Sequence, residues 1–218
     1  MADESLIQAT YEARDKFVRS LGTDYNEVLA PLINPSFLGG PMWPNLRQAW
    51  RVIGQGANTI LISDGLSDPF SDEPEPNAGF GIEILAETTD PMPEQLQVSW
   101  LFDLVYQVSQ QCAAHGDVRD LIDEFGLISL ELPMSEVLQR VATSNNRIGV
   151  LLGLPAPGVQ PYFVSPAGSV RVVTAKLLWP SELEYAVSNR KPGRKELAKR
   201  FTADRTHHRS SMSRKAVI

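Results

Sequence analysis

The sequence is poor in the residues that bind metals. Its 218 residues include one cysteine, Cys112, and three histidines, of which only His115 lies before position 207. One thiol cannot form an internal disulfide or supply the cysteine pairs of a structural zinc site. A single histidine in the body of the chain also excludes a histidine-rich site. We therefore predict no bound metal, and Cys112, on the apolar face of an expected helix, as a buried and unreactive thiol.

Long apolar runs and targeting segments are also lacking. The longest apolar run, residues 148–154, is far shorter than the roughly 18 residues needed to cross a bilayer. The acidic start at residues 1–5 has neither the basic region nor the apolar region of a secretory signal. These absences predict a cytoplasmic protein without a membrane anchor.

Motifs for nucleotide binding and nucleophilic catalysis are missing too. Gly54-Gln55-Gly56 lacks the third glycine of a dinucleotide-binding fingerprint, and no G-x-x-x-x-G-K occurs. The segment 65–69 begins like a nucleophile elbow, but Pro69 stands where the strained turn needs glycine. We predict that the chain is not an enzyme and needs no cofactor. The alternative left open is a metal-dependent hydrolase that uses Asp64, Asp68, Glu83 and His115.

The charge is unevenly distributed along the chain. The net charge is −6, yet ten of the 20 Lys and Arg residues follow position 188, where only Glu196 and Asp204 are acidic. We predict a folded domain over residues 1–188 and a flexible basic tail over residues 189–218. A second alternative is a regulatory protein that contacts nucleic acid through this tail. It is the less favoured one, because only Phe201 in the tail could stack on bases.

Hydrophobic periodicity predicts strands that outnumber the helices. Amphipathic helices are expected over residues 6–21 and 98–112, a short helix over 46–53, and a last helix opened by a capping box of Ser181 and Glu184. Strands are expected over residues 59–63, 80–86, 127–132, 150–152, 162–164 and 170–178. Because the strands are not each separated by a helix, we predict an α+β fold with one mixed, mostly antiparallel sheet and helices packed on it.

Two smaller expectations bear on the site. Glu83 alternates with Ile82 and Ile84, so its side chain is expected on the opposite face of the sheet. The segment 31–44 contains too many proline and glycine residues for a regular element, and its apolar residues are expected to cover the core.

Two motifs carry a resemblance to a known family. Residues 62–70, Ile-Ser-Asp-Gly-Leu-Ser-Asp-Pro-Phe, end a strand in a G-L-S-D turn, and residues 79–84, Gly-Phe-Gly-Ile-Glu-Ile, return as G-F-G-x-E. Together with residues 100–115 and 176–183, they make the chain similar to the suppressor-of-fused-like domain family over about residues 25–187. The resemblance implies a mixed α/β binding module without catalysis. Stand-alone bacterial members of the family are grouped with immunity proteins that neutralise toxins.

The resemblance also places a binding surface. It implies that a protein partner, either a toxin or a peptide strand, binds the 64–80 loop and the adjacent strand edge. The predicted partner-binding residues are Leu66, Asp68, Phe70, Asp72 and Phe80. Phe70 would be an apolar anchor inside a negative rim, which would attract a basic partner. The family has tyrosine at this position, so Phe70 lacks the hydroxyl that a polar contact would use.

Overall fold

Eight strands form one mixed sheet in the computed structural model, which describes residues 4–73 and 75–218 apart from the side chain of Asn26. The strand order is β1-β2-β3-β4-β8-β6-β5, with β7 paired to β8, and only β4 and β8 run parallel. The strands are β1 (Thr23–Leu29), β2 (Ala49–Gln55), β3 (Asn58–Asp64), β4 (Ile82–Thr88), β5 (Ile128–Pro133), β6 (Arg147–Leu152), β7 (Tyr162–Ser165) and β8 (Gly168–Leu178). The α-helices are α1 (Glu4–Ser20), α2 (Trp100–His115), α3 (Val118–Phe125) and α4 (Pro180–Ala203).

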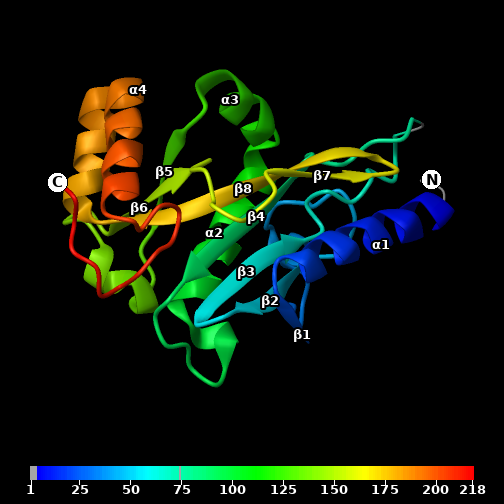
Figure 1. Ribbon diagram of the computed structural model, residues 1–218. Helices are drawn as coiled ribbons and strands as arrows, with labels where there is room; N and C mark the ends of the chain where they lie inside the picture. The colour runs from blue at the N-terminus through cyan, green and yellow to red at the C-terminus, as the bar shows by residue number, and fades with distance from the viewer. Residues whose placement is uncertain (1–3, 74) are drawn as a thin grey trace.

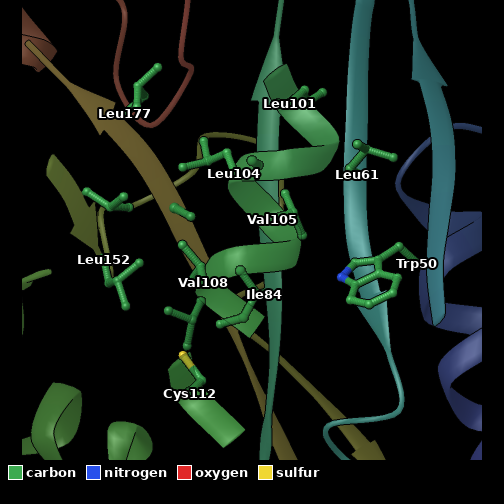
Figure 2. Packing of buried hydrophobic residues seen from close by; sticks show 14 of the residues in the cluster. Trp50, Leu61, Ile84, Leu101, Leu104, Val105, Val108, Cys112, Leu152 and Leu177 are labelled. Atoms are coloured by element: carbon green, nitrogen blue, oxygen red, sulfur yellow. The ribbon is translucent and has the colours of Figure 1, made fainter. Parts of the chain in front are cut away.

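Helices α1 and α2 lie on opposite faces of this sheet (Figure 1). Figure 2 shows Val108 of α2 near Ile84 of β4, with Leu104 one turn away along the helix, all in the larger core. Leu85, the next residue of β4, belongs instead to the cluster that holds Phe17 of α1. Successive side chains of a strand point to opposite faces, and all seven residues of β4 are buried, Glu83 and Glu87 included, so β4 is covered on both faces.

Most of the expected elements are present, and the differences have local causes. The predicted helix over 46–53 is wrong, because these residues run into strand β2, which is buried on both faces and so shows no period of two. Strand β1 and helix α3 were not predicted from the sequence. The last helix begins at Pro180 with Trp179 as its N-cap, two residues before the predicted N-cap Ser181, so the predicted capping box of Ser181 and Glu184 is wrong. There the carboxylate of Glu182 accepts a hydrogen bond from the backbone N–H of Trp179 at 2.8 Å.

Helix α4 is a hairpin of two arms rather than one continuous rod (Figure 1). The backbone of Arg190 leaves the helical region at φ 50° and ψ −136°, two residues before Pro192. Proline has no N–H to donate and its ring clashes with the preceding turn, so a helix breaks near it. Gly193 lets the arms meet, because a β-carbon there would lie 2.6 Å from Cβ of Asn189.

The prediction of a flexible tail over residues 189–218 is wrong. The second arm of α4 buries Leu197 and Phe201 completely, in a cluster with Leu183 and Ala186 of the first arm. Leu197 and Phe201 are four residues apart, so they lie on one face of the helix and form its apolar stripe. This short stripe was not recognised in the sequence. The structure therefore does not divide the chain at residue 188.

Polar contacts hold the segment after α4 against the body. His208 Nε2 lies 2.6 Å from a carboxylate oxygen of Glu87, and both side chains are buried. Arg214 pairs with Glu182 at 2.5 Å, also out of solvent, and Ser210 forms a bridge with Thr88 of β4. The described part of the chain contains no helix long and apolar enough to cross a membrane.

Candidate functional site at the 64–80 loop

The first half of the 64–80 loop is buried in the fold. It leaves β3 at Asp64, and Leu66 points into the core with no exposed surface. The loop returns beside its own start, where the N–H of Phe80 donates to the carbonyl of Leu66 at 2.9 Å. Gly79 permits this return, because a β-carbon there would lie only 2.2 Å from the carbonyl oxygen of Asp68. The glycine of the second motif is thus required by backbone packing.

Glu83 of β4 organises this turn from the α1 side of the sheet, as its alternation with Ile82 and Ile84 predicted. One carboxylate oxygen accepts the backbone N–H groups of Gly65 and Ser67, at 3.2 and 3.1 Å, and the Ser67 hydroxyl at 2.6 Å. The other oxygen accepts the hydroxyl of Ser63. The serine and glycine positions of the motif therefore match the donors that a buried carboxylate needs.

Arg14 of α1 joins three buried carboxylates. Its Nε lies 2.5 Å from Asp64, and its Nη1 lies 2.7 Å from Asp68 and 3.5 Å from Glu83. The Arg14 side chain is only 2% exposed, and the three carboxylates are 0–3% exposed. Arg47 adds a second cation on Asp64. We call Arg14, Asp64, Asp68 and Glu83 the buried ion network. A guanidinium suits this place because its fork of donors can serve several carboxylates at once.

The charge states in the buried ion network differ among its members. Burial raises the pKa of Glu83 to about 7, although Arg14 and the hydroxyls of Ser63 and Ser67 lower it. Burial also raises the pKa of Asp68, against the opposing effect of Arg14. For Asp64, burial raises the pKa, but Arg14 and Arg47 outweigh it, and the net shift is downward. Burial likewise opposes the cationic form of Arg14, yet its three carboxylate neighbours raise its pKa overall, so Arg14 stays charged.

The raised pKa of Glu83 predicts a pH-dependent stability. The folded protein keeps a proton on Glu83 between the ordinary value of 4.5 and about 7, where the unfolded chain has lost it. This group's contribution to the free energy of unfolding therefore falls as pH rises through that window and is level above it. Glu83→Gln mimics the protonated form and lacks this titration. Urea denaturation of both proteins at a series of pH values should show wild type losing stability relative to Glu83→Gln as pH rises to about 7. A difference in the free energy of unfolding between the two proteins that stays constant with pH would contradict the raised pKa of Glu83.

The residues of the hydrolase alternative are only partly brought together. Asp64, Asp68 and Glu83 meet around the guanidinium of Arg14. His115 lies at the end of α2, where its Nε2 is 2.8 Å from the amide nitrogen of Gln111. Within residues 4–73 and 75–218 there is no group of three or more His, Cys, Asp or Glu side chains placed to hold a metal ion. Burial raises the pKa of the Cys112 thiol to about 12, which keeps it a thiol.

The described residues in the second half of the loop, 70–73 and 75–80, are exposed or half-buried. Asp72 is exposed, and Phe70 and Phe80 are each half-buried. Their rings pack edge to face with centroids 5.3 Å apart. The side-chain oxygen of Asn77 holds both sides of the loop, accepting the N–H of Phe70 at 2.8 Å and that of Gly79 at 3.1 Å. The exposed half is therefore a tied loop that presents two aromatic rings.

The five predicted partner-binding residues thus divide into two groups. Leu66 and Asp68 are fully buried, so their assignment as contact residues is wrong: one packs in the core and the other pairs with Arg14. Phe70, Asp72 and Phe80 remain available to a partner. Arg14 was not predicted as a site residue, although its position in the helix pattern indicates that it is buried. Arg14 lies four residues after Thr10 and three before Phe17, on the stripe of α1 that is buried.

Comparisons with known proteins confirm the fold. No protein-family model matches the chain, and no curated protein does. The chain is similar to a solved structure of a Sufu–Fu complex, with 16% identity and a TM-score of 0.57 over 97% of this chain and 92% of that one. It is also similar to Drosophila Suppressor of Fused, with 14% identity and a TM-score of 0.61 over all of this chain. The match spans 54% of the Drosophila chain, about half its length. The protein has a Suppressor of Fused-like fold of the predicted α+β class.

Proposed function

We propose that the chain is a non-catalytic module that binds a protein partner through the exposed half of the 64–80 loop and the adjacent edge of β7. The observation that carries the proposal is the pair of half-buried rings, Phe70 and Phe80, held on a tied loop. Rigid aromatic side chains of this kind serve as interface anchors because little conformational entropy is lost when they are covered. The solved Sufu–Fu complex, in which a protein of similar fold is assembled with another protein, supports the same class of function.

The charge of the loop favours a basic partner. Asp72, Glu73 and Glu75 are all exposed around the two rings. A partner with a basic patch or strand would be attracted to this rim, which mainly raises the rate of association. Beside the loop, β7 pairs with β8 and carries Val164, which is 78% exposed. A peptide strand is therefore one form that the partner could take, and a toxin neutralised by this chain is another. A toxin gene next to the gene for this chain would favour the second form.

The buried ion network supports a non-catalytic role. Its three carboxylates are engaged with Arg14, and Glu83 also accepts bonds from the loop backbone. These contacts hold the loop in position and keep the carboxylates away from solvent. A substrate would have to displace the Arg14 contacts to reach them. The network is thus best understood as the support of the loop.

The test of the proposal is Phe70→Ala. A partner captured from the source cells with the tagged chain is purified, and its affinity for wild type and variant is measured by calorimetry. We expect binding to weaken by about 2 kcal/mol or more, because an anchor side chain is removed. We expect a stability loss below the roughly 3–5 kcal/mol of a fully buried phenylalanine, because Phe70 is only half-buried.

The matched control is Val187→Ala, which shortens an exposed apolar side chain on α4, away from the loop. It should leave the affinity unchanged. A Phe70→Ala protein that melts like wild type and binds at full strength would defeat the assignment of the loop.

A further inference from the structure

The connection between β1 and β2 is the most apolar exposed segment of the molecule. Residues 30–46, here the 30–46 loop, contain no charged residue, although 21% of the chain is charged. Of the fourteen exposed large apolar side chains in the described part of the chain, six belong to this loop. They are Leu32, Ile33, Phe37, Leu38, Met42 and Leu46. The expectation that the apolar residues of segment 31–44 cover the core is therefore wrong for most of them.

This loop is anchored by a buried tryptophan and by a hydrogen bond between its two ends. Trp43 is 4% exposed and packs edge to face on Trp50, with ring centroids 5.4 Å apart. Asn34 accepts the N–H of Ser36 at 3.0 Å and donates to the carbonyl of Leu46 at 2.6 Å, which joins the two ends of the loop. Trp43 and Pro44 are buried, whereas Met42 beside them is exposed.

The exposed area is large for a monomer. Leu32, Phe37, Leu38 and Met42 are each more than 70% exposed, and Ile33 and Leu46 about 60%. At ordinary side-chain sizes the six residues expose on the order of 800 Å², whereas the largest apolar patch on a typical monomer is roughly 300–600 Å². About 800 Å² per partner is the area that a specific protein–protein interface buries. The loop is thus large enough to form one side of a stable dimer.

A groove lies beside the most protruding part of the loop. It has a volume of about 320 Å³, and its apolar lining comes from Pro35 and Pro41 of the loop, Tyr106 and Ala114 of α2, and Leu132 and Pro133 at the end of β5. Three glutamines of α2, at positions 107, 110 and 111, add polar groups to its wall. The turn of 3-10 helix Pro35–Leu38, which carries the exposed Phe37 and Leu38, forms its border. Because the protruding apolar pair lies next to a groove of the same chain, a two-fold axis can place the pair of each copy in the groove of the other, as a self-complementary interface requires.

We propose that two copies of this chain form a two-fold dimer through the 30–46 loop, with Phe37 and Leu38 of each copy entering the groove of the other. The charge pattern favours a second copy as the occupant. A two-fold axis places a surface opposite itself, so charges of one sign would repel there. This chain has a net charge of −6 and keeps the 30–46 loop free of charge. Phe37 and Leu38 are not part of the 64–80 loop, although Pro44, near the end of the 30–46 loop, lies next to Gly79.

The test is the mass of the full-length chain in solution, measured by sedimentation across a wide range of concentrations. Wild type should form a concentration-dependent dimer. Phe37→Asp and Leu38→Asp should each raise the dimer dissociation constant at least about 30-fold, because each buries a charge in the interface. Both positions are more than 70% exposed, so neither variant should change the melting temperature of the monomer. Val187→Asp is the matched control, since it places the same charge at an exposed apolar position of α4, outside the loop.

Three outcomes would overturn the proposal. One is a wild-type chain that stays monomeric at the highest concentration measured. Another is a dimer whose dissociation constant is unchanged by Phe37→Asp and Leu38→Asp. The third is a dimer that is lost with Val187→Asp as well as with the loop variants, which would mean that the interface lies elsewhere. If wild type is monomeric, binding of another protein or of lipid vesicles through the 30–46 loop would identify the occupant that replaces the second copy.

Discussion

Replacing Arg14 with methionine is expected to lower the free energy of unfolding by about 3–5 kcal/mol, because the change leaves buried carboxylates without their cation. Methionine fills much of the same space, so the loss comes from charge rather than from a cavity. Asp64 keeps Arg47, but Asp68 and Glu83 would lose their ion pair with Arg14 in a site closed to water. Urea denaturation followed by circular dichroism at neutral pH measures the effect.

Two variants of α1 separate the charge effect from a general effect on the helix. Arg19→Ala removes an arginine that is 64% exposed and pairs with Asp15, and it should change stability by less than about 1 kcal/mol. Arg14→Lys keeps the charge but loses the planar fork that reaches Asp64 and Asp68 together, so it should fall between wild type and Arg14→Met. An Arg14→Met protein as stable as Arg19→Ala would show that the buried ion network does not support the fold.

Truncation after Ser188 is expected to abolish cooperative folding. It removes Leu197 and Phe201, and the burial of each side chain contributes about 2–5 kcal/mol to the free energy of unfolding. It also removes His208 and Arg214, which would leave the buried Glu87 and Glu182 without their ion pairs. These losses together approach the roughly 5–15 kcal/mol by which a whole domain is stable. The measurement is thermal melting by near-ultraviolet circular dichroism.

Point variants within α4 show whether the truncation acts through packing. Phe201→Ala should cost about 3–5 kcal/mol, whereas Lys195→Ala, at an exposed position of the same arm, should cost almost nothing. If the truncated chain melts cooperatively within about 5 °C of wild type, the second arm and the segment after it are dispensable, as a flexible tail would be.

The sequence by itself determined which segments form most of the helices and strands. The period of the apolar residues in α1 and α2 is set by the helix itself, and the β-branched runs of β3 and β8 are typical of buried strands wherever they occur. The two motifs around the 64–80 loop could also be recognised in the sequence and carried the resemblance. Their serines, glycines and Glu83 form the hydrogen bonds of a single turn.

Only the tertiary structure decided which of these residues face solvent. Leu66 and Phe70 look equally available in the sequence, yet one is in the core and the other on the surface, because burial depends on what packs against a loop from elsewhere. Arg14 and Glu83 are 69 residues apart, and no local pattern joins them. Residues 189–218 look solvated because most of them are charged or polar. Leu197 and Phe201 nevertheless pack this segment against the body. The stabilisation from their buried apolar area and from the paired charges outweighs the polar composition of the rest of the segment.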